Sequence, residues 1–228
     1  MELLILNEER MKKLFYLSLA VFFLFAVTGA FAEGGKVEST KANKAVETKK
    51  ADDTKKVDMK KYEKRKADNP EIAIQTDLGV MNLELFRDVA PIHVDSMLSL
   101  IRKKFYDGLT FHRVIDGFMI QGGDPKGNGS GDAGYNLPAE FSKLNHLEGT
   151  LSMARSADPN SASCQFFICL APTPFLDGKY TIFGHLMEGY DVLHKIGSTK
   201  VAGEKPVQDM VIRKMTILKD VVPKSPAK

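Results

Sequence analysis

The 228 residues of this chain could hold one large domain or two small ones, and their composition is uneven along the sequence. The 32 Lys and Arg nearly balance the 29 Asp and Glu, which leaves a net charge of +3. This near balance, with acidic and basic residues interleaved, argues against a nucleic-acid partner, because only blocks of one sign create a strong field.

An apolar block at Leu14–Val27 follows two lysines and precedes a small-residue pattern that ends at Ala32. This layout predicts a secretory signal peptide over residues 1–32, cleaved after Ala32. The block is shorter than the roughly 20 apolar residues of a spanning helix. A retained N-terminal anchor is the alternative, and only then would the protein contact a membrane. Whether translation starts at Met1 or Met11, the remainder is expected to be exported to a bacterial periplasm or cell envelope.

Residues 33–69 carry twelve Lys or Arg and eight Asp or Glu, without any Leu, Ile or Phe. Such a segment cannot bury enough apolar area to offset its chain entropy, so it is predicted to be a charged flexible linker. The alternative is a basic arm for nucleic acid or anionic lipid, and the interleaved acids argue against it. Residues 221–228 are expected to be a disordered tail.

Residues 70–220 have the periodicity of a folded domain, which begins with a predicted β-hairpin at 71–85. Apolar residues alternate with others on both sides of a turn that contains Gly79. Pro91 then opens a predicted helix, where its missing N–H costs nothing. The apolar residues of this helix recur at three-four-seven spacing as far as residue 105, before the turn at Gly108.

Short apolar runs separated by glycines follow, and they predict further strands. These runs are Met119–Gln121, Thr150–Ala154, Gln165–Leu170, Tyr180–Leu186 and Met210–Leu218, with a second helix predicted at Tyr190–Ile196. Many short strands and two helices, without regular βαβ alternation, favour a mainly β fold in which an antiparallel sheet closes into a barrel.

No pattern in the sequence predicts a metal or cofactor site. The five histidines are scattered and have no carboxylate or thiol at a metal-ligand spacing. Cys164 and Cys169 lie in a predicted strand, about 16 Å apart and on opposite faces. A disulfide needs less than about 7 Å between Cα atoms, so both are expected to be packing residues. The glycine-rich segment at 127–131 is expected to be a surface loop rather than a phosphate site.

The run Phe111–Asp124, FHRVIDGFMIQGGD, combines polar and apolar residues in an unusual way. Arg113 and Gln121 flank an Asp-Gly turn that would set them on adjacent strands. Phe118 and Met119 supply apolar surface beside them. A polar pair at the rim of an apolar patch indicates a small ligand site.

This run resembles the hallmark segment of the cyclophilins. Two further blocks, GTLSMARSADPNSASCQFFICL at 149–170 and FLDGKYTIFGHL at 175–186, resemble that family's other signatures in their order and spacing. With the hairpin and first helix, the resemblance covers Glu71–Leu218. It implies a closed antiparallel eight-stranded barrel capped by two α-helices. It also implies a cofactor-independent peptidyl-prolyl cis/trans isomerase that acts on Pro-containing polypeptides.

The resemblance assigns catalysis to Arg113 and Gln121. Arg113 would donate to the proline nitrogen of the twisted amide, and Gln121 would orient Arg113 or a substrate carbonyl. The family's proline pocket corresponds to Phe118, Met119, Phe167 and Leu176, and the neighbouring groove to Ala154, Arg155 and Gln165. His112 is adjacent to Arg113 on a predicted strand, so it would face the other way and be structural.

Two residues of the expected substrate site depart from the family pattern: Phe175 stands where many members have Trp, and Tyr180 where many have His. Because Phe lacks the indole N–H donor, weak binding of the inhibitor cyclosporin is expected, while isomerase activity should persist. A non-catalytic module that binds Pro-containing segments is the main alternative, although it need not keep Arg113 and Gln121 together. A surface adhesin or envelope spacer is a third reading. The sequence indicates no oligomeric state.

Overall fold

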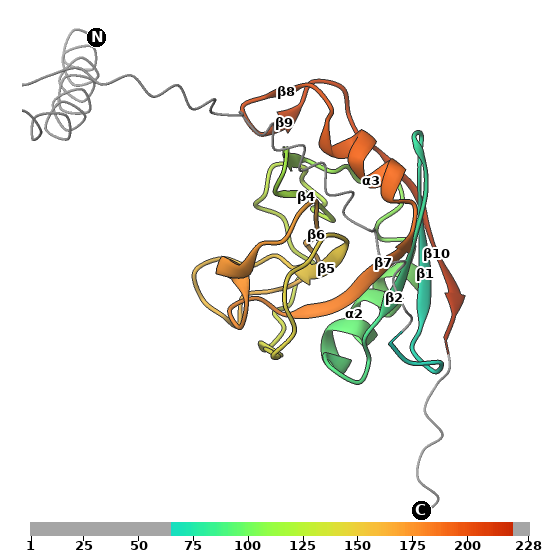
Figure 1. Cartoon of the computed structure of the whole chain (residues 1–228), viewed down its shortest axis with the longest axis vertical. Coiled ribbons are helices and arrows are strands. Elements are labelled where there is room, and N and C mark those ends of the chain that lie inside the picture. The colour runs from blue at the N-terminus through green and yellow to red at the C-terminus, as the bar shows by residue number, and fades with distance from the viewer. Residues whose placement is uncertain (1–64, 221–228) are drawn as a thin grey trace, which may run out of the picture. The chain divides into compact units, whose positions relative to one another are not determined.

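The structure of this chain is a computed structural model, which describes residues 65–220 (Figure 1). The predicted signal peptide or anchor, the linker as far as residue 64 and the tail at 221–228 lie outside the described residues. Within the described part, no helix combines the length and the apolar character needed to cross a bilayer. Export, the linker and the tail therefore stay predictions.

One antiparallel sheet contains eight strands, in the order β10-β1-β2-β7-β5-β6-β4-β3. They are β1 (Glu71–Thr76), β2 (Gly79–Leu85), β3 (Arg113–Ile115), β4 (Met119–Gly122), β5 (Thr150–Met153), β6 (Phe166–Cys169), β7 (Ile182–Glu188) and β10 (Ile212–Lys219). A separate hairpin pairs β8 (Val201–Ala202) with β9 (Lys205–Pro206), and the helical elements are α2 (Pro91–Arg102), α3 (Tyr190–Gly197) and the 3-10 turn η1 (Pro174–Leu176). For residues 65–220, the predicted mainly β fold with two α-helices is confirmed.

The hairpin of β1 and β2 follows from the alternation of its apolar residues. Ile72 pairs with Leu83 and Ile74 with Met81, and all four side chains are fully buried. At the turn, Gly79 has a φ of 134°, which residues with a Cβ atom rarely adopt. The predicted hairpin is therefore confirmed, in the register that turns its apolar face to the core.

Helix α2 begins at Pro91 and has no side-chain cap from the residue before it. Its first N–H groups are satisfied by a distant residue, because the Glu140 carboxylate accepts hydrogen bonds from the backbone N–H of Ile92 and His93, at 3.1 and 3.0 Å. The helix ends before Lys104, whose φ of 56° is incompatible with helix, so it is shorter than predicted. Tertiary contacts thus set its beginning, and a local turn sets its end.

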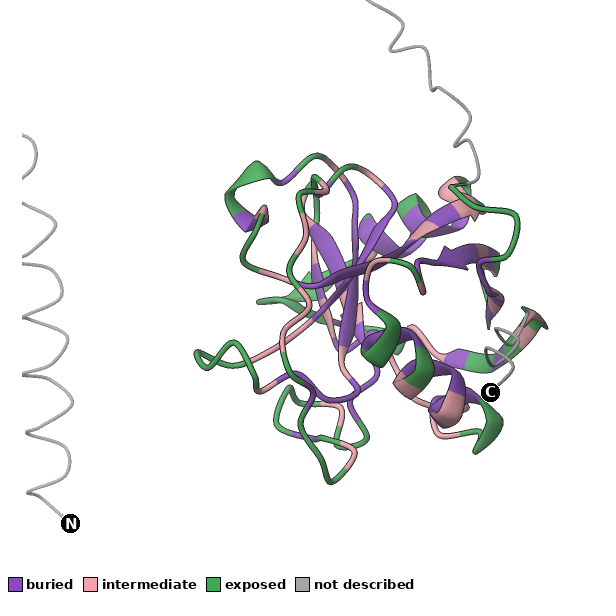
Figure 2. Cartoon of the chain, turned by 90° about the horizontal axis from the view of Figure 1, so that it is seen from below, coloured by how far each residue is buried: buried purple, intermediate pink, exposed green. Residues whose placement is uncertain are grey.

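The core lies inside the curved sheet, where the buried residues gather on the strands and on the inward sides of the helices (Figure 2). Phe166 is fully buried, and its ring meets those of Tyr106 and Phe111 edge-on, with centroids 5.7 and 6.1 Å apart. Helix α2 contacts β10 and β7, whereas α3 contacts β2, β3 and β4. The two helices therefore cover opposite ends of the core (Figure 1).

The prediction of a closed barrel is wrong, because the sheet is a curled half-barrel. Its end strands, β3 and β10, form no ladder with each other. The segment before β3 bonds instead to the start of β10, through an isolated bridge between Thr110 and Val211 and the backbone hydrogen bonds around it. The outer edge of β3 is taken by the β8–β9 hairpin, where the carbonyl of Glu204 accepts from the N–H of Val114 at 2.8 Å. Because a strand edge can pair only once, β10 cannot close the sheet at β3.

The first described residues contact the domain, although their composition placed them in the predicted linker. The carboxylate of Glu84 is fully buried and accepts hydrogen bonds from the backbone N–H of Arg65 and Lys66, at 2.8 and 3.0 Å. Asn69 donates to the same carboxylate at 2.7 Å. Since an unpaired buried charge is very costly, these donors stabilise Glu84 and attach residues 65–69 to β2.

Candidate active site

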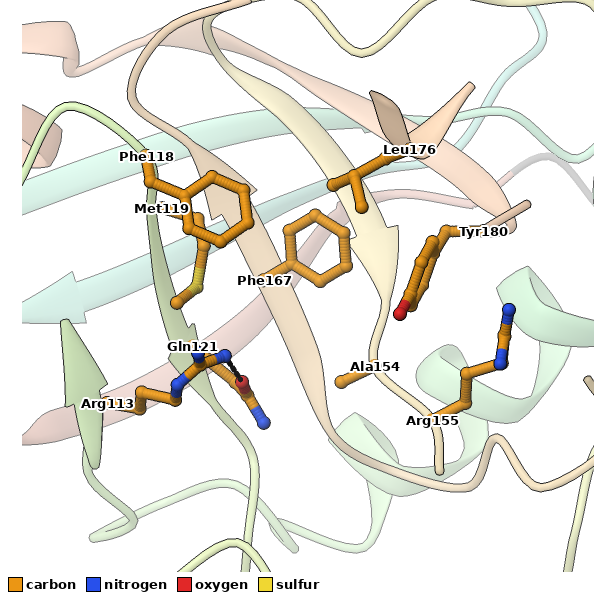
Figure 3. Close-up of a pocket in the computed structure, with 9 residues that line it drawn as sticks. All are labelled: Arg113, Phe118, Met119, Gln121, Ala154, Arg155, Phe167, Leu176 and Tyr180. Atoms are coloured by element: carbon orange, nitrogen blue, oxygen red, sulfur yellow. Dashed lines mark hydrogen bonds between the residues drawn. The ribbon is translucent and has the colours of Figure 1, made fainter. Parts of the chain in front are cut away.

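A pocket of about 110 Å³ lies on the face of the sheet that is turned away from the core. Figure 3 shows its side chains around one opening. The pocket is lined by Arg113, Phe118, Met119, Gln121, Ala154, Arg155, Phe167, Leu176 and Tyr180. Strand alternation explains the division between core and pocket. In β6, Phe166 packs in the core cluster, whereas Phe167 belongs to the pocket cluster.

The two cysteines follow the same division. Cys164 lies in the core cluster and Cys169 in the pocket cluster, both as buried free thiols. Burial raises the pKa of each thiol to about 11, so both stay protonated at neutral pH. A packing role for both cysteines is therefore confirmed.

Arg113 and Gln121 face each other across β3 and β4. The two residues are paired in the sheet register, and Arg113 Nη1 donates to Gln121 Oε1 at 3.2 Å (Figure 3). The turn between the strands contains Gly117 with a φ of 69°, a left-handed conformation that favours glycine. The short turn and the pleat of the two strands together place both side chains on the pocket face, as the sequence predicts.

A second glutamine sets the orientation of Gln121. Gln165 Nε2 donates to the carbonyls of Gly129 and Gly131, at 3.0 and 2.8 Å, so its amide oxygen is left facing Gln121 Nε2 at 2.9 Å. Gln121 must then present its own oxygen to Arg113. The loop carbonyls thereby decide which end of each amide faces the guanidinium.

Asp124 organises the loop that supplies these carbonyls. Its carboxylate is only 1% exposed and accepts the backbone N–H groups of Lys126, Asn128 and Gly129, at 2.8, 3.0 and 2.5 Å. A Cβ atom at Gly131 would lie 1.9 Å from the same carboxylate, so only glycine fits there. Burial by itself raises the pKa of Asp124, but the three N–H donors outweigh it and leave the pKa below its ordinary value.

Replacing Asp124 with asparagine is expected to destabilise the domain by about 1–3 kcal/mol at pH 7, because hydrogen bonds to a buried charged acceptor are lost. The folded-state pKa of Asp124 is depressed, so its contribution is present above pH 4 and is lost as the pH falls through the folded pKa. Urea unfolding of the chain and the variant at pH 7 and pH 3 measures this. Asp132→Asn, at an exposed aspartate with one N–H partner, is the control. A stability difference of equal size at both pH values would contradict the prediction.

Glu204 is a pocket neighbour that no sequence pattern indicates. It lies in the turn of the β8–β9 hairpin, and its carboxylate accepts from Arg113 Nε at 2.5 Å. This hydrogen bond lowers the pKa of Glu204, so the carboxylate is charged at neutral pH. Arg113 is thus bonded at Nε by Glu204 and at Nη1 by Gln121, which leaves three of its five N–H donors for a ligand.

Aromatic side chains form the opposite wall. Phe167 meets Tyr180 edge-on, with centroids 5.9 Å apart, and the Cζ atom of Arg155 lies 4.4 Å from the centroid of the Tyr180 ring. Behind Phe167, the ring of His146 is stacked at 6.1 Å and 10°. Burial lowers the pKa of His146 below its ordinary value despite a carboxylate beside it. This part of the wall is therefore neutral behind Phe167 and cationic at Arg155.

Nine of the eleven predicted site residues line the pocket, and two lie elsewhere. Gln165 is behind Gln121. Phe175 is 60% exposed at the rim, with its ring 5.5 Å from that of Phe118. His112 is buried and outside the lining, as predicted for a residue that faces away from Arg113.

The pocket is small, and its lining combines an apolar cluster with polar and charged side chains. Within residues 65–220, no three His, Cys, Asp or Glu side chains come together in a way that could hold a metal ion. A volume of about 110 Å³ is well below the roughly 300–1,000 Å³ of small-molecule sites. Fold and site thus define a half-barrel protein with a small pocket, in which an apolar cluster lies beside a guanidinium held by Glu204 and Gln121.

Comparisons with known proteins agree with this class. A sequence profile of the family described as "Cyclophilin type peptidyl-prolyl cis-trans isomerase/CLD" matches residues 71–217. The chain therefore belongs to the cyclophilin-type peptidyl-prolyl cis-trans isomerases.

Individual relatives give the same picture. Peptidyl-prolyl cis-trans isomerase ppi1 of Schizosaccharomyces pombe is 42% identical over 153 residues, which cover 64% of this chain and 98% of that protein. Peptidyl-prolyl cis-trans isomerase-like 2 of Cryptococcus neoformans is 40% identical over 169 residues, or 70% of this chain but only 29% of that longer relative. The crystal structure of a Cryptosporidium parvum cyclophilin type isomerase in the presence of the dipeptide Ala-Pro matches with a TM-score of 0.63 and 33% identity, covering 66% of this chain and 99% of that one.

Proposed function

We propose that this chain is a peptidyl-prolyl cis/trans isomerase that accelerates rotation about X-Pro bonds in exported or unfolded polypeptides. The observation that carries the proposal is the geometry of Arg113. Its guanidinium is bonded on one side by Glu204 and on the other by Gln121, and it stands at the edge of an apolar pocket of single-ring size. A donor oriented in advance is what a reaction without covalent chemistry requires.

Rotation about an X-Pro bond is slow because amide resonance must be broken, against a barrier of about 18–20 kcal/mol. A catalyst must bind the twisted amide more tightly than either planar form. In the twisted state the proline nitrogen regains a lone pair, and a free N–H of Arg113 would donate to it. Because that lone pair exists only while the amide is twisted, the hydrogen bond would stabilise the transition state more than the planar forms and would lower the barrier.

The apolar side chains would hold the proline ring while the amide twists. Proline has no backbone N–H, so its burial leaves no donor unsatisfied. Met119 is 2%, Phe167 5% and Leu176 8% exposed, and they form one cluster. Phe118 packs against this cluster and closes one side. Gln121, oriented by Gln165, would keep the guanidinium in place or contact a substrate carbonyl.

The alternative is a non-catalytic module that uses the same pocket to bind a Pro-containing segment. A protease-coupled isomerisation assay on the purified full-length chain, paired with NMR titration of the same peptide, separates the two functions. Acceleration that is proportional to protein concentration supports the isomerase. Saturable binding without any acceleration would favour the binding module.

The predicted signal sequence supports an exported setting, in a bacterial periplasm or at the cell envelope, for this activity. The apolar block at Leu14–Val27 and the small residues before Glu33 carry this part of the proposal. N-terminal sequencing of the exported protein tests it. Glu33 as the first residue indicates cleavage, a retained N-terminus indicates an anchor, and a protein found only in the cytoplasm contradicts export.

Cyclosporin is expected to bind weakly, and Phe175→Trp is expected to tighten binding about 3–10-fold. The reason is that one indole N–H donor is gained, and a net hydrogen bond is worth about 0.5–1.5 kcal/mol. Phe175 is 60% exposed, so the larger ring can be accommodated. Calorimetric titration measures the change. Phe141→Trp, at an exposed phenylalanine outside the pocket lining, is the control, and equal affinities of all three proteins would contradict the prediction.

A further inference from the structure

Two arginines line the pocket, and they differ in whether a carboxylate forms an ion pair with them. Arg113 forms an ion pair with Glu204. Arg155, on the opposite side of the pocket in Figure 3, has no carboxylate within 4.0 Å among residues 65–220. Its positive charge is therefore not neutralised by an ion pair, although it borders a site that would take a polypeptide.

Backbone carbonyls and an aromatic ring fix the position of the Arg155 guanidinium. Its Nε and Nη2 donate to the carbonyl of Lys179 at 3.3 and 2.9 Å, and Nη1 donates to those of Ser156 and Ala157 at 2.8 and 3.2 Å. The face of Tyr180 lies 4.4 Å from Cζ. Four of five N–H donors are occupied and one at Nη2 remains. A ligand therefore meets a cation that is already ordered.

One further cation and two acids lie near Arg155 in the sequence and the fold. The ammonium of Lys179 bonds to the carbonyl of Phe175 at 3.1 Å, so a second cation lies at the same rim. Of the neighbouring acids, Asp177 accepts from His146 and Asp158 from the backbone N–H of Asn160. Neither acid forms an ion pair with Arg155 or Lys179, so the fixed guanidinium of Arg155 can still pair with a carboxylate of a ligand.

We infer that Arg155, supported by Tyr180, forms a subsite for an acidic side chain next to the substrate proline, so that the enzyme prefers X-Pro segments with a flanking Asp or Glu. This inference rests on the proposed isomerase function and specifies its substrate class. Binding a peptide removes water from the cation, and a carboxylate from the peptide compensates for that loss where a neutral side chain does not. A lysine at the same place is repelled.

Three otherwise identical peptides, with Glu, Gln or Lys beside the proline, test the subsite in two sets, one for each side of the proline. In one of the two sets, kcat/KM for the full-length protein is expected to be about 2–5-fold higher for the Glu peptide than for the Gln peptide, which is the effect of a partly exposed charge pair. The Lys peptide of that set is expected to have the lowest kcat/KM. At about 1 M salt, where the screening length is near 3 Å, the three rates should converge.

Arg155→Gln is expected to abolish the ratio between the Glu and Gln peptides. Lys214→Gln removes the same charge from an exposed position on β10, outside the pocket lining, and should keep the ratio. Equal kcat/KM for the Glu and Gln peptides in both sets, or a preference that persists in Arg155→Gln, would overturn the inference and leave the isomerase proposal intact.

If no peptide is accelerated, the isomerase proposal fails by itself. NMR titration with the same peptides then decides the subsite, since tighter binding of the Glu peptide supports it and equal binding refutes it.

Discussion

Turnover on a Pro-containing peptide is expected to fall about tenfold or more when Arg113 is replaced with alanine, as it does when an enzyme loses one transition-state donor. Gln121 and Glu204 hold the guanidinium before substrate arrives, so its contribution belongs to the twisted amide. The effect should appear mainly in kcat, with little change in peptide affinity. Isomerisation kinetics at saturating and limiting peptide concentrations measure both quantities.

The fold should survive this substitution, because the Arg113 side chain is 38% exposed and an exposed ion pair contributes only about 0–1 kcal/mol. Arg213→Ala is the matched control, since Arg213 also donates to a carboxylate, that of Asp77, on a strand outside the pocket. Arg113→Lys keeps the charge without the planar fork and should give an intermediate rate. An unchanged rate in Arg113→Ala, with Gln121 intact, would remove Arg113 from the mechanism.

Replacing Phe166 with alanine is expected to lower the free energy of unfolding by about 3–5 kcal/mol. The Phe166 ring is fully buried and packs edge-on against Tyr106 and Phe111, so its removal leaves a cavity. Phe166 also pairs with Gly122 and Met153 in the sheet, which joins β4 and β5 through β6. A domain is typically stable by only about 5–15 kcal/mol, so this one change threatens the fold. Urea unfolding followed by circular dichroism measures it.

Phe141→Ala is the control, because Phe141 is 44% exposed and its loss should change stability by less than about 0.5 kcal/mol. If Phe166→Ala does not fold at all, Phe166→Leu provides the measurement, with a smaller loss and a smaller cavity. A loss below about 1 kcal/mol in Phe166→Ala would show that the core around Tyr106 repacks freely, against the expectation for a close-packed interior.

Local patterns predicted the elements of the fold well. Alternating residues predicted the β1–β2 hairpin, and three-four-seven spacing predicted α2 and α3. The sequence missed η1 and the β8–β9 hairpin, with three and two residues per element, because periodicity cannot be read over so few positions. It also overstated closure of the barrel, since no local pattern shows that Glu204 takes the outer edge of β3.

The sequence predicted which residues belong to the site better than it predicted how they are arranged. Arg113 and Gln121 are eight residues apart on either side of a short turn, so the pleat alone brings them together. The roles of the predicted residues remain predictions until the variants are measured. The structure placed Gln165 behind Gln121 and Phe175 at the rim, which depends on how a loop and η1 pack against the sheet.

By itself, the sequence determined the hairpin, the helices, the apolar faces of the strands and the identity of the run around Arg113. These features depend on neighbours within a few residues. Only the tertiary structure decided that Glu204, 91 residues from Arg113, bonds its guanidinium, and that Arg155 stacks on Tyr180 without an ion pair. The physical reason is that such contacts arise when segments distant in the chain pack side by side, and their distances follow from the packing of the whole domain.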